Sequence, residues 1–211
     1  MPKATKTKKA AKTKKAAKAR KSPKAARASK TVKAAKSAHA PRTSETPYSL
    51  LFKDVKQELA TTRRILERVP DGNDDWSPHE KSAKLAGLAT HVAQLPGFGI
   101  MMLTTEEFDG SSRRPEPKVT SNAERLKLFD GVSGQLLALL ENLTWDRAMS
   151  TWRFRFGDRI IAEDSRGGMI RTIVITHLAH HRAQLGVYLR LLGIPVPGTY
   201  GPSADEPFGA K

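Results

Sequence analysis

The sequence predicts an all-α protein, a four-helix bundle preceded by a disordered basic N-terminal tail. Three observations support this prediction. The excess positive charge is confined to the first residues, apolar residues recur at helical spacing in four segments between Ser49 and Gly193, and one long polar connection separates the second segment from the third. We place the tail at residues 1–45 and the bundle domain at residues 46–207.

The tail accounts for the whole formal net charge of +16. Sixteen of the 37 basic residues lie in residues 1–42, which contain no acidic residue, so the rest of the chain has 21 basic and 21 acidic residues. With no aromatic residue and almost no large apolar one, this segment cannot bury enough surface to offset its chain entropy. Its Lys/Ala repeats resemble the tails of linker histones and of bacterial histone-like proteins. We therefore expect residues 1–42 to bind DNA or another polyanion without sequence specificity.

The first two helices are predicted from residues spaced three and four apart. The first carries apolar residues from Leu51 to Val69 and ends at Pro70. The second is expected over about Ser82–Leu95, and Pro96-Gly97 is expected to break it. The polar connection from Pro96 to Ser121 is then long enough to cross the bundle.

The last two helices have clear boundary signals. Ser121 and Glu124 form a capping-box pattern at the start of the third helix. The fourth is expected over about Gly168–Leu192, with Gly193 at its end. Between them, residues 152–162 alternate apolar and polar side chains around Gly157, which indicates a small hairpin or an irregular strand pair.

Composition excludes several classes of site. The chain has no cysteine, so it has no disulfide, thiolate metal site or cysteine nucleophile. The N-terminus lacks the apolar core of a secretory signal. The longest uncharged run, Leu85 to Thr105, contains His91, Gln94 and Pro96, and we interpret it as a buried helix rather than a membrane span. We expect a cytoplasmic protein without a membrane partner.

Three histidines lie on the predicted inward faces of two helices. His177 and His181 are four residues apart on the fourth helix, so both imidazoles can reach one ion, and His91 has the equivalent position on the second. His180 could replace one of the pair, but it belongs to the row of residues that flanks the inward face of this helix. Three neutral nitrogens would leave a metal with an open position, as in catalytic sites. From the residues alone, three core histidines hydrogen-bonded to carbonyl groups are an equal alternative.

Two segments resemble the motifs of the DinB family. Residues 177–184, His-Leu-Ala-His-His-Arg-Ala-Gln, are similar to the family's pattern of a His, three residues and then His-Arg-Gly-Gln, with Ala183 in place of the usual Gly. The similarity continues to Glu206. Residues 76–92 are similar to the family's second-helix motif, which ends near His91. The resemblance covers roughly residues 46–207.

The resemblance implies a four-helix bundle of up-down-down-up type with a three-histidine site at His91, His177 and His181. The expected cofactor is a divalent metal ion: nickel, zinc or manganese. It also implies kinship with thiol-dependent transferases and isomerases, and hence a small-molecule or thiol substrate. Asp205 and Glu206 follow in the C-terminal segment, where either could accept a hydrogen bond from a ligand or act as a general base; a solvated loop is equally consistent.

Two functions follow from these observations. The first is a metal-dependent hydrolase or thiol transferase that its tail holds at DNA or another polyanion, which would add nucleoid association. The second is a non-enzymatic, nucleoid-associated or stress-related DNA-binding protein, whose bundle forms a homodimer and whose histidines hold a structural metal.

Overall fold

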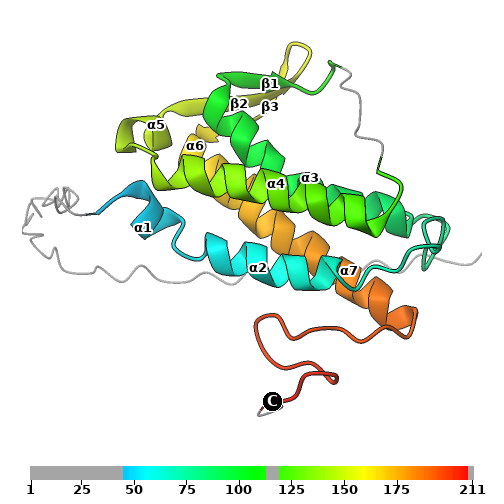
Figure 1. Ribbon diagram of the computed structural model, residues 1–211. Helices are drawn as coiled ribbons and strands as arrows, with labels where there is room; N and C mark the ends of the chain where they lie inside the picture. The colour runs from blue at the N-terminus through cyan, green and yellow to red at the C-terminus, as the bar shows by residue number, and fades with distance from the viewer. Residues whose placement is uncertain (1–44, 113–118, 209–211) are drawn as a thin grey trace, which may run out of the picture. The chain divides into compact units, whose positions relative to one another are not determined.

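The computed structural model describes residues 45–112 and 119–208. The predicted tail lies outside these residues apart from Glu45, and its boundary with the domain at 46–207 stays a prediction. The described part is mainly helical and carries a small three-stranded sheet at one end of the long helices (Figure 1). The label all-α was therefore wrong in this respect.

Eleven elements follow one another in the described residues. They are α1 (Pro47–Leu51), α2 (Val55–Leu66), α3 (Leu85–Thr104), β1 (Glu107–Asp109), α4 (Asn122–Glu141), α5 (Trp145–Met149), β2 (Thr151–Phe156), β3 (Arg159–Ser165), α6 (Arg166–Met169), the π-helix η1 (Ile170–Thr176) and α7 (His177–Leu191).

The long helices enclose the core. Helix α3 packs on α4 and α7, and α2 packs on the same two helices. In Figure 1, α3 and α4 run in one direction, and α2 and α7 run in the opposite direction. The fully buried side chains include Leu85 on α3, Leu136 on α4 and Leu185 on α7, so the apolar stripes predicted from the sequence face one another.

Helix boundaries agree with the sequence where a local signal marks them. The Ser121 hydroxyl caps α4 by accepting from the Glu124 backbone N–H at 3.3 Å. The Glu124 carboxylate turns to Thr120, accepting from its backbone N–H at 2.7 Å, instead of completing the expected capping box. Gly193 follows the α7 C-cap residue Leu192 with a φ of +73°, a conformation that glycine adopts without steric cost.

The predicted break at Pro96 is wrong. Helix α3 continues through Pro96 to Thr104, although proline removes one helical hydrogen bond and costs about 3 kcal/mol in a helix interior. Burial offsets this cost, because Leu95, Pro96, Met102 and Leu103 all lie in the interior. The crossing segment consequently begins at Thr105 and includes β1.

Helix α3 also passes the length and hydropathy test for a membrane span, and within the described residues no other helix does. Half of the apolar window is buried against the rest of the fold. The core helix of a water-soluble protein has the same properties, which agrees with the buried helix predicted here.

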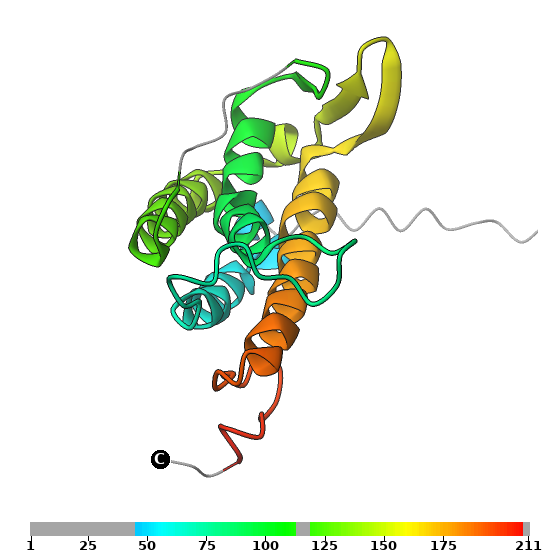
Figure 2. The same cartoon turned by 90° about the vertical axis from the view of Figure 1, so that its right-hand side faces the viewer.

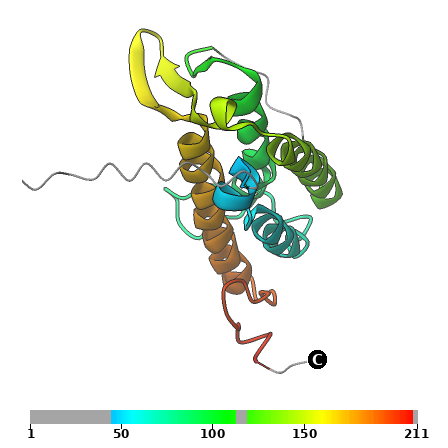
Figure 3. The ribbon, with the colours of Figure 1, turned by 90° about the vertical axis from the view of Figure 1, so that its left-hand side faces the viewer.

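The sheet has the order β1-β2-β3. Strands β2 and β3 form the antiparallel hairpin that the alternating residues predicted, and Gly157 turns it with a φ of +59°. Strand β1 pairs in parallel with β2, a contact that the sequence did not indicate. The hairpin projects beyond the helix ends (Figures 2 and 3).

Candidate metal centre

The structure brings together the three histidines that the sequence singled out. His91 lies on α3, while His177 and His181 lie one turn apart at the start of α7. One ligand nitrogen from each ring falls within 4.8 Å of the other two. The ring centroids are 4.5 Å apart for His177 and His181, and 5.2 and 4.6 Å from His91 to these two residues, respectively. This cluster could hold a metal ion.

The π-helix η1 ends directly before His177. In this wider turn, the Thr176 hydroxyl donates to the carbonyl oxygen of Arg171, five residues earlier, at 3.0 Å. Inserting a π-turn changes which residues of the following helix face the interior, and such turns recur at functional sites. No sequence signal predicts η1, and the sequence treated residues 168–192 as one regular helix.

Hydrogen bonds at the Nδ1 atoms orient two of the rings. Nδ1 of His177 lies 3.2 Å from the Ile173 carbonyl oxygen, and Nδ1 of His181 lies 2.7 Å from Oε1 of Gln184. Both partners are acceptors, so we assign the ring proton to Nδ1 in each case. The two Nε2 atoms are then unprotonated and available as ligands.

The two Nε2 atoms face each other at 2.6 Å. Two lone pairs at this distance repel unless a cation, either a metal ion or a shared proton, lies between them. The donor set therefore fits a borderline-soft divalent ion such as zinc or nickel, which imidazole binds well. Gln184 was part of the sequence motif, but its role as an acceptor for His181 emerges only from the structure.

Burial favours the neutral form of two of the three histidines, His91 and His181. Desolvation, with smaller contributions from His181 and His177, lowers the pKa of His91 to about 4. Desolvation also lowers the pKa of His181, against an opposing contribution from Gln184. Both side chains are thus uncharged at neutral pH, as metal ligands must be. His180 is exposed and, although its ring lies 4.8 Å from that of His181, it is not part of the cluster.

A cavity of about 680 Å³ adjoins the cluster, and His91 and His177 line one part of it. Its walls come from α3, α4, η1 and the sheet. Pockets of this volume accommodate small organic ligands. The cluster is therefore accessible to a molecule larger than water.

Asp205 and Glu206 lie away from this cavity, in the segment of residues 194–208 that turns back after α7, here called the C-terminal strap. Asp205 pairs with Arg190 and accepts from the Val196 backbone N–H at 2.8 Å. Glu206 pairs with Arg64 of α2 at 2.6 Å. Neither carboxylate is bonded to a cluster histidine, so the structure gives both a role in holding the strap.

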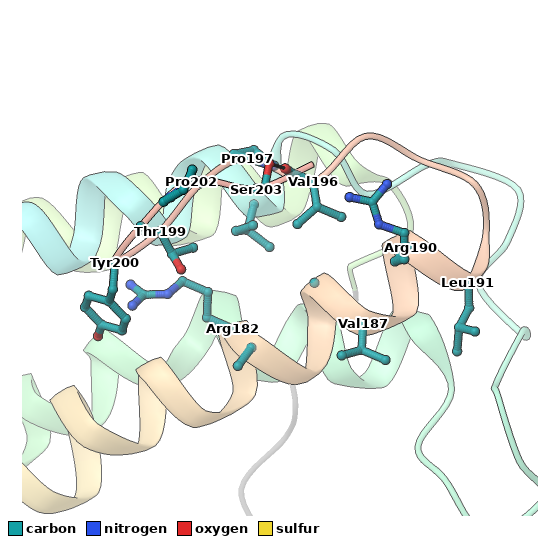
Figure 4. A pocket seen from close by; sticks show the side chains of 15 residues that line it. Arg182, Val187, Arg190, Leu191, Val196, Pro197, Thr199, Tyr200, Pro202 and Ser203 are labelled. Atoms are coloured by element: carbon teal, nitrogen blue, oxygen red, sulfur yellow. Dashed lines mark hydrogen bonds between the residues drawn. The ribbon is translucent and has the colours of Figure 1, made fainter. Parts of the chain in front are cut away.

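Arg182, the neighbour of His181, contacts both the C-terminal strap and α2. Its guanidinium is almost fully buried and pairs with Glu58 of α2 at 2.9 Å. It lies 4.9 Å from the ring centroid of Tyr200, and Figure 4 shows it directed towards that ring beneath the strap. The Tyr200 hydroxyl donates to Glu58 at 2.8 Å. Sequence reasoning gave these residues no role.

Fold and site together define a mainly helical domain with a histidine cluster able to hold a metal ion. The family model for the DinB family matches residues 37–208, most of the chain. The protein therefore belongs to the DinB family, as its motifs predicted.

Comparisons with individual proteins agree. The chain is 39% identical over 149 residues to the uncharacterized protein YrdA of Bacillus subtilis (strain 168), covering 71% of this chain and 85% of YrdA. The crystal structure of the DinB-like protein YjoA from Bacillus subtilis superposes with a TM-score of 0.51 at 17% identity, covering 68% of this chain and 94% of YjoA. A DinB-like protein from Bacillus cereus ATCC 10987 gives 0.54 at 19% identity, with 71% and 95% covered. The two structures support the fold.

Proposed function

We propose that this protein is a metal-dependent enzyme built on the up-down-down-up four-helix bundle of its family. His91, His177 and His181 would hold one divalent ion, and nickel, zinc and manganese are the candidates. The observation that carries the proposal is the cluster of three histidines, whose ligand nitrogens all lie within 4.8 Å of one another, with a cavity next to it.

A bound divalent ion would act as a Lewis acid, which serves hydrolysis and thiol transfer alike. The surrounding residues prepare the site for it. The Ile173 carbonyl and the Gln184 amide fix the two rings of α7, so that little reorganisation is needed. The low pKa of His91 prevents a proton from competing for its ligand nitrogen at neutral pH. The cavity would hold the substrate beside the cluster and limit the access of water.

Elemental analysis of the purified full-length protein tests the metal site. We expect about one equivalent of metal in the wild type and its loss in His91→Ala and His181→Ala. His180→Ala is the matched control, because this exposed histidine lies on the same helix outside the cluster. Its replacement should leave the metal content unchanged. Metal-free wild-type protein that also fails to take up added nickel, zinc or manganese would refute the site.

Enzymatic activity requires its own test. Hydrolytic and thiol-transfer substrates would be screened with the ion found in the protein, in parallel with His181→Ala. Turnover that disappears in this variant and persists in His180→Ala would support an enzyme. Full metal occupancy without turnover on either class would favour the second candidate, a non-enzymatic DNA-binding protein with a structural metal.

The positive charge of residues 1–42 favours a nucleic-acid partner for either candidate. We propose that this segment tethers the protein to DNA through phosphate contacts. About eight such contacts would give a slope near −7 when log affinity is plotted against log salt concentration. The comparison is between the full-length protein and a full-length variant with the thirteen lysines of this segment replaced by glutamine. Equal DNA affinities would refute the tether.

A further inference from the structure

The cavity beside the histidine cluster has one wall made by the sheet. Phe108 of β1 and Phe154 of β2 are register partners, and their rings stack with centroids 5.7 Å apart and planes 14° from parallel. Trp152 and Phe156 lie two residues to either side of Phe154, so all three belong to the same set of alternating positions, and all line the cavity. The sheet thus contributes an aromatic surface to the pocket.

The residues between these aromatic side chains are charged and paired elsewhere. Arg153 pairs with Glu163, and Arg155 pairs with Glu107 and Asp109. Among the described residues that line the cavity there is no Asp, Glu, Lys or Arg. Without a metal ion in the cluster, a charged ligand would find no oppositely charged partner among these described lining residues, and the loss of its hydration disfavours binding.

Gln94 is the polar side chain that helix α3 adds to this lining beside His91. It lies one turn after that histidine, is half-buried, and makes no side-chain hydrogen bond within the described part of the chain. An amide in this position can donate to, or accept from, a ligand group in the cavity. A ligand lacking such a group would leave the amide without a partner.

We infer that this cavity binds a neutral, largely apolar molecule with an aromatic or aliphatic body, whose polar group faces Gln94 and the histidines. The inference deepens the proposed function, because it takes the cavity as the substrate site of the same enzyme. The sheet packs against the apolar body, and the polar group is directed towards the cluster. The volume of about 680 Å³ suits a molecule of up to three fused or linked rings.

The test uses N-phenyl-1-naphthylamine, a neutral two-ring fluorophore with an attached phenyl group, titrated into the full-length protein. Gly97→Phe places a ring in the cavity, and its Cβ meets no atom closer than Val132 Cγ1 at 3.8 Å. We expect this variant to bind the probe about tenfold more weakly or worse. Gly87→Phe is the matched control on the same helix, because it is exposed and its Cβ has open space. It should bind like the wild type.

A second variant that fills the cavity keeps the test decisive if Gly97→Phe fails to fold. Val132→Phe adds volume from α4 and should weaken the probe in the same way. An unchanged affinity in both Gly97→Phe and Val132→Phe would overturn the inference. So would equally tight, Gly97-dependent binding of the sulfonated analogue 1-anilinonaphthalene-8-sulfonate to protein freed of metal by chelation, since the described lining residues offer its charge no partner.

Gln94→Leu tests the polar end of the cavity. This change keeps the approximate size of the side chain and removes the amide. The preference of the protein for 2-naphthol over naphthalene should fall by about three- to tenfold, the value of one hydrogen bond. An unchanged preference would overturn the role of Gln94.

Metal content, measured on the same samples, separates this inference from the proposed function. Metal-free protein with Gly97-dependent probe binding would refute the metal site and support the pocket. Metal-loaded protein whose probe binding is unchanged in Gly97→Phe would support the metal site and refute the pocket.

Discussion

Replacing Arg182 by Met should destabilise the fold strongly, because Arg182 belongs to a buried ion pair. The guanidinium is 2% exposed and its partner Glu58 is 7% exposed, so the pair is almost completely removed from water. Arg182 also donates to the Glu58 carbonyl oxygen and to the Thr62 hydroxyl, both at 3.1 Å. The variant keeps much of the buried side-chain volume and leaves the Glu58 carboxylate with the Tyr200 hydroxyl.

The magnitude follows from this burial. Removing one partner of a buried ion pair costs about 3–5 kcal/mol, because the remaining charge stays desolvated. For a domain of this size each kcal/mol lowers the melting temperature by about 2–4 °C, so a decrease of about 6–20 °C is expected. Arg64→Met is the matched control, since Arg64 of α2 holds the same strap through an ion pair with Glu206 that is about half exposed and is worth about 1 kcal/mol or less.

Urea unfolding followed by circular dichroism, with metal removed by chelation, measures both variants without a contribution from ligand binding. A double-mutant cycle with Glu58→Gln isolates the pair, and the coupling energy should be at least about 2 kcal/mol. If Arg182→Met cost no more than Arg64→Met, or if the coupling were near zero, the assignment of Arg182 as the buried anchor between α7 and α2 would be refuted.

Three further predictions concern the scaffold. Gly99→Ala should destabilise the protein by about 1–2 kcal/mol in urea unfolding, because the new Cβ would lie 2.8 Å from the buried Leu136. Gly87→Ala, whose Cβ has open space, should stabilise the protein by about 0.5–1 kcal/mol. Equal changes in stability in the two variants would contradict this prediction. Ser121→Ala should cost about 1 kcal/mol through loss of the α4 cap, and an unchanged urea midpoint would contradict it. Hydrogen bonds from Ser111 hold the pKa of Asp109 at about 2, below its usual 3.8, so its contribution to stability is present above pH 3.8 and is lost as the pH falls through 2; a carboxyl resonance titrating near pH 4 would contradict this.

The helical part of the fold could be predicted because its signals are local. Spacings of three and four residues, the Ser121 cap and Gly193 each act within one or two turns, and the structure agrees at each. Pro96 misled the prediction because its local penalty is small beside the burial of α3 along both flanks. Strand β1 has three residues and pairs with a partner more than forty residues later, so no local pattern could reveal it.

The candidate site likewise has a part that follows from local sequence and a part that depends on tertiary packing. Helical geometry alone places His177 and His181 on one face, and the acceptors of their Nδ1 protons also come from the same helical run, at Ile173 and Gln184. His91 reaches them only because α3 packs against α7, a tertiary contact that the inward stripes anticipated. The π-turn that sets the rotation of α7 gave no sign in the sequence.

The histidine cluster and the aromatic wall can change independently in evolution. The two α7 histidines and their acceptors form a nearly self-contained unit, whose ligand geometry depends on one helix. The aromatic wall depends on β1 and β2, which contribute no histidine, and Trp152 of β2 also packs into the core. Substitutions at Phe108, Phe154 or Phe156 would therefore alter the shape of the pocket while leaving the three histidines in place. On such a scaffold, the arrangement of the histidines and the shape of the pocket can change independently of each other.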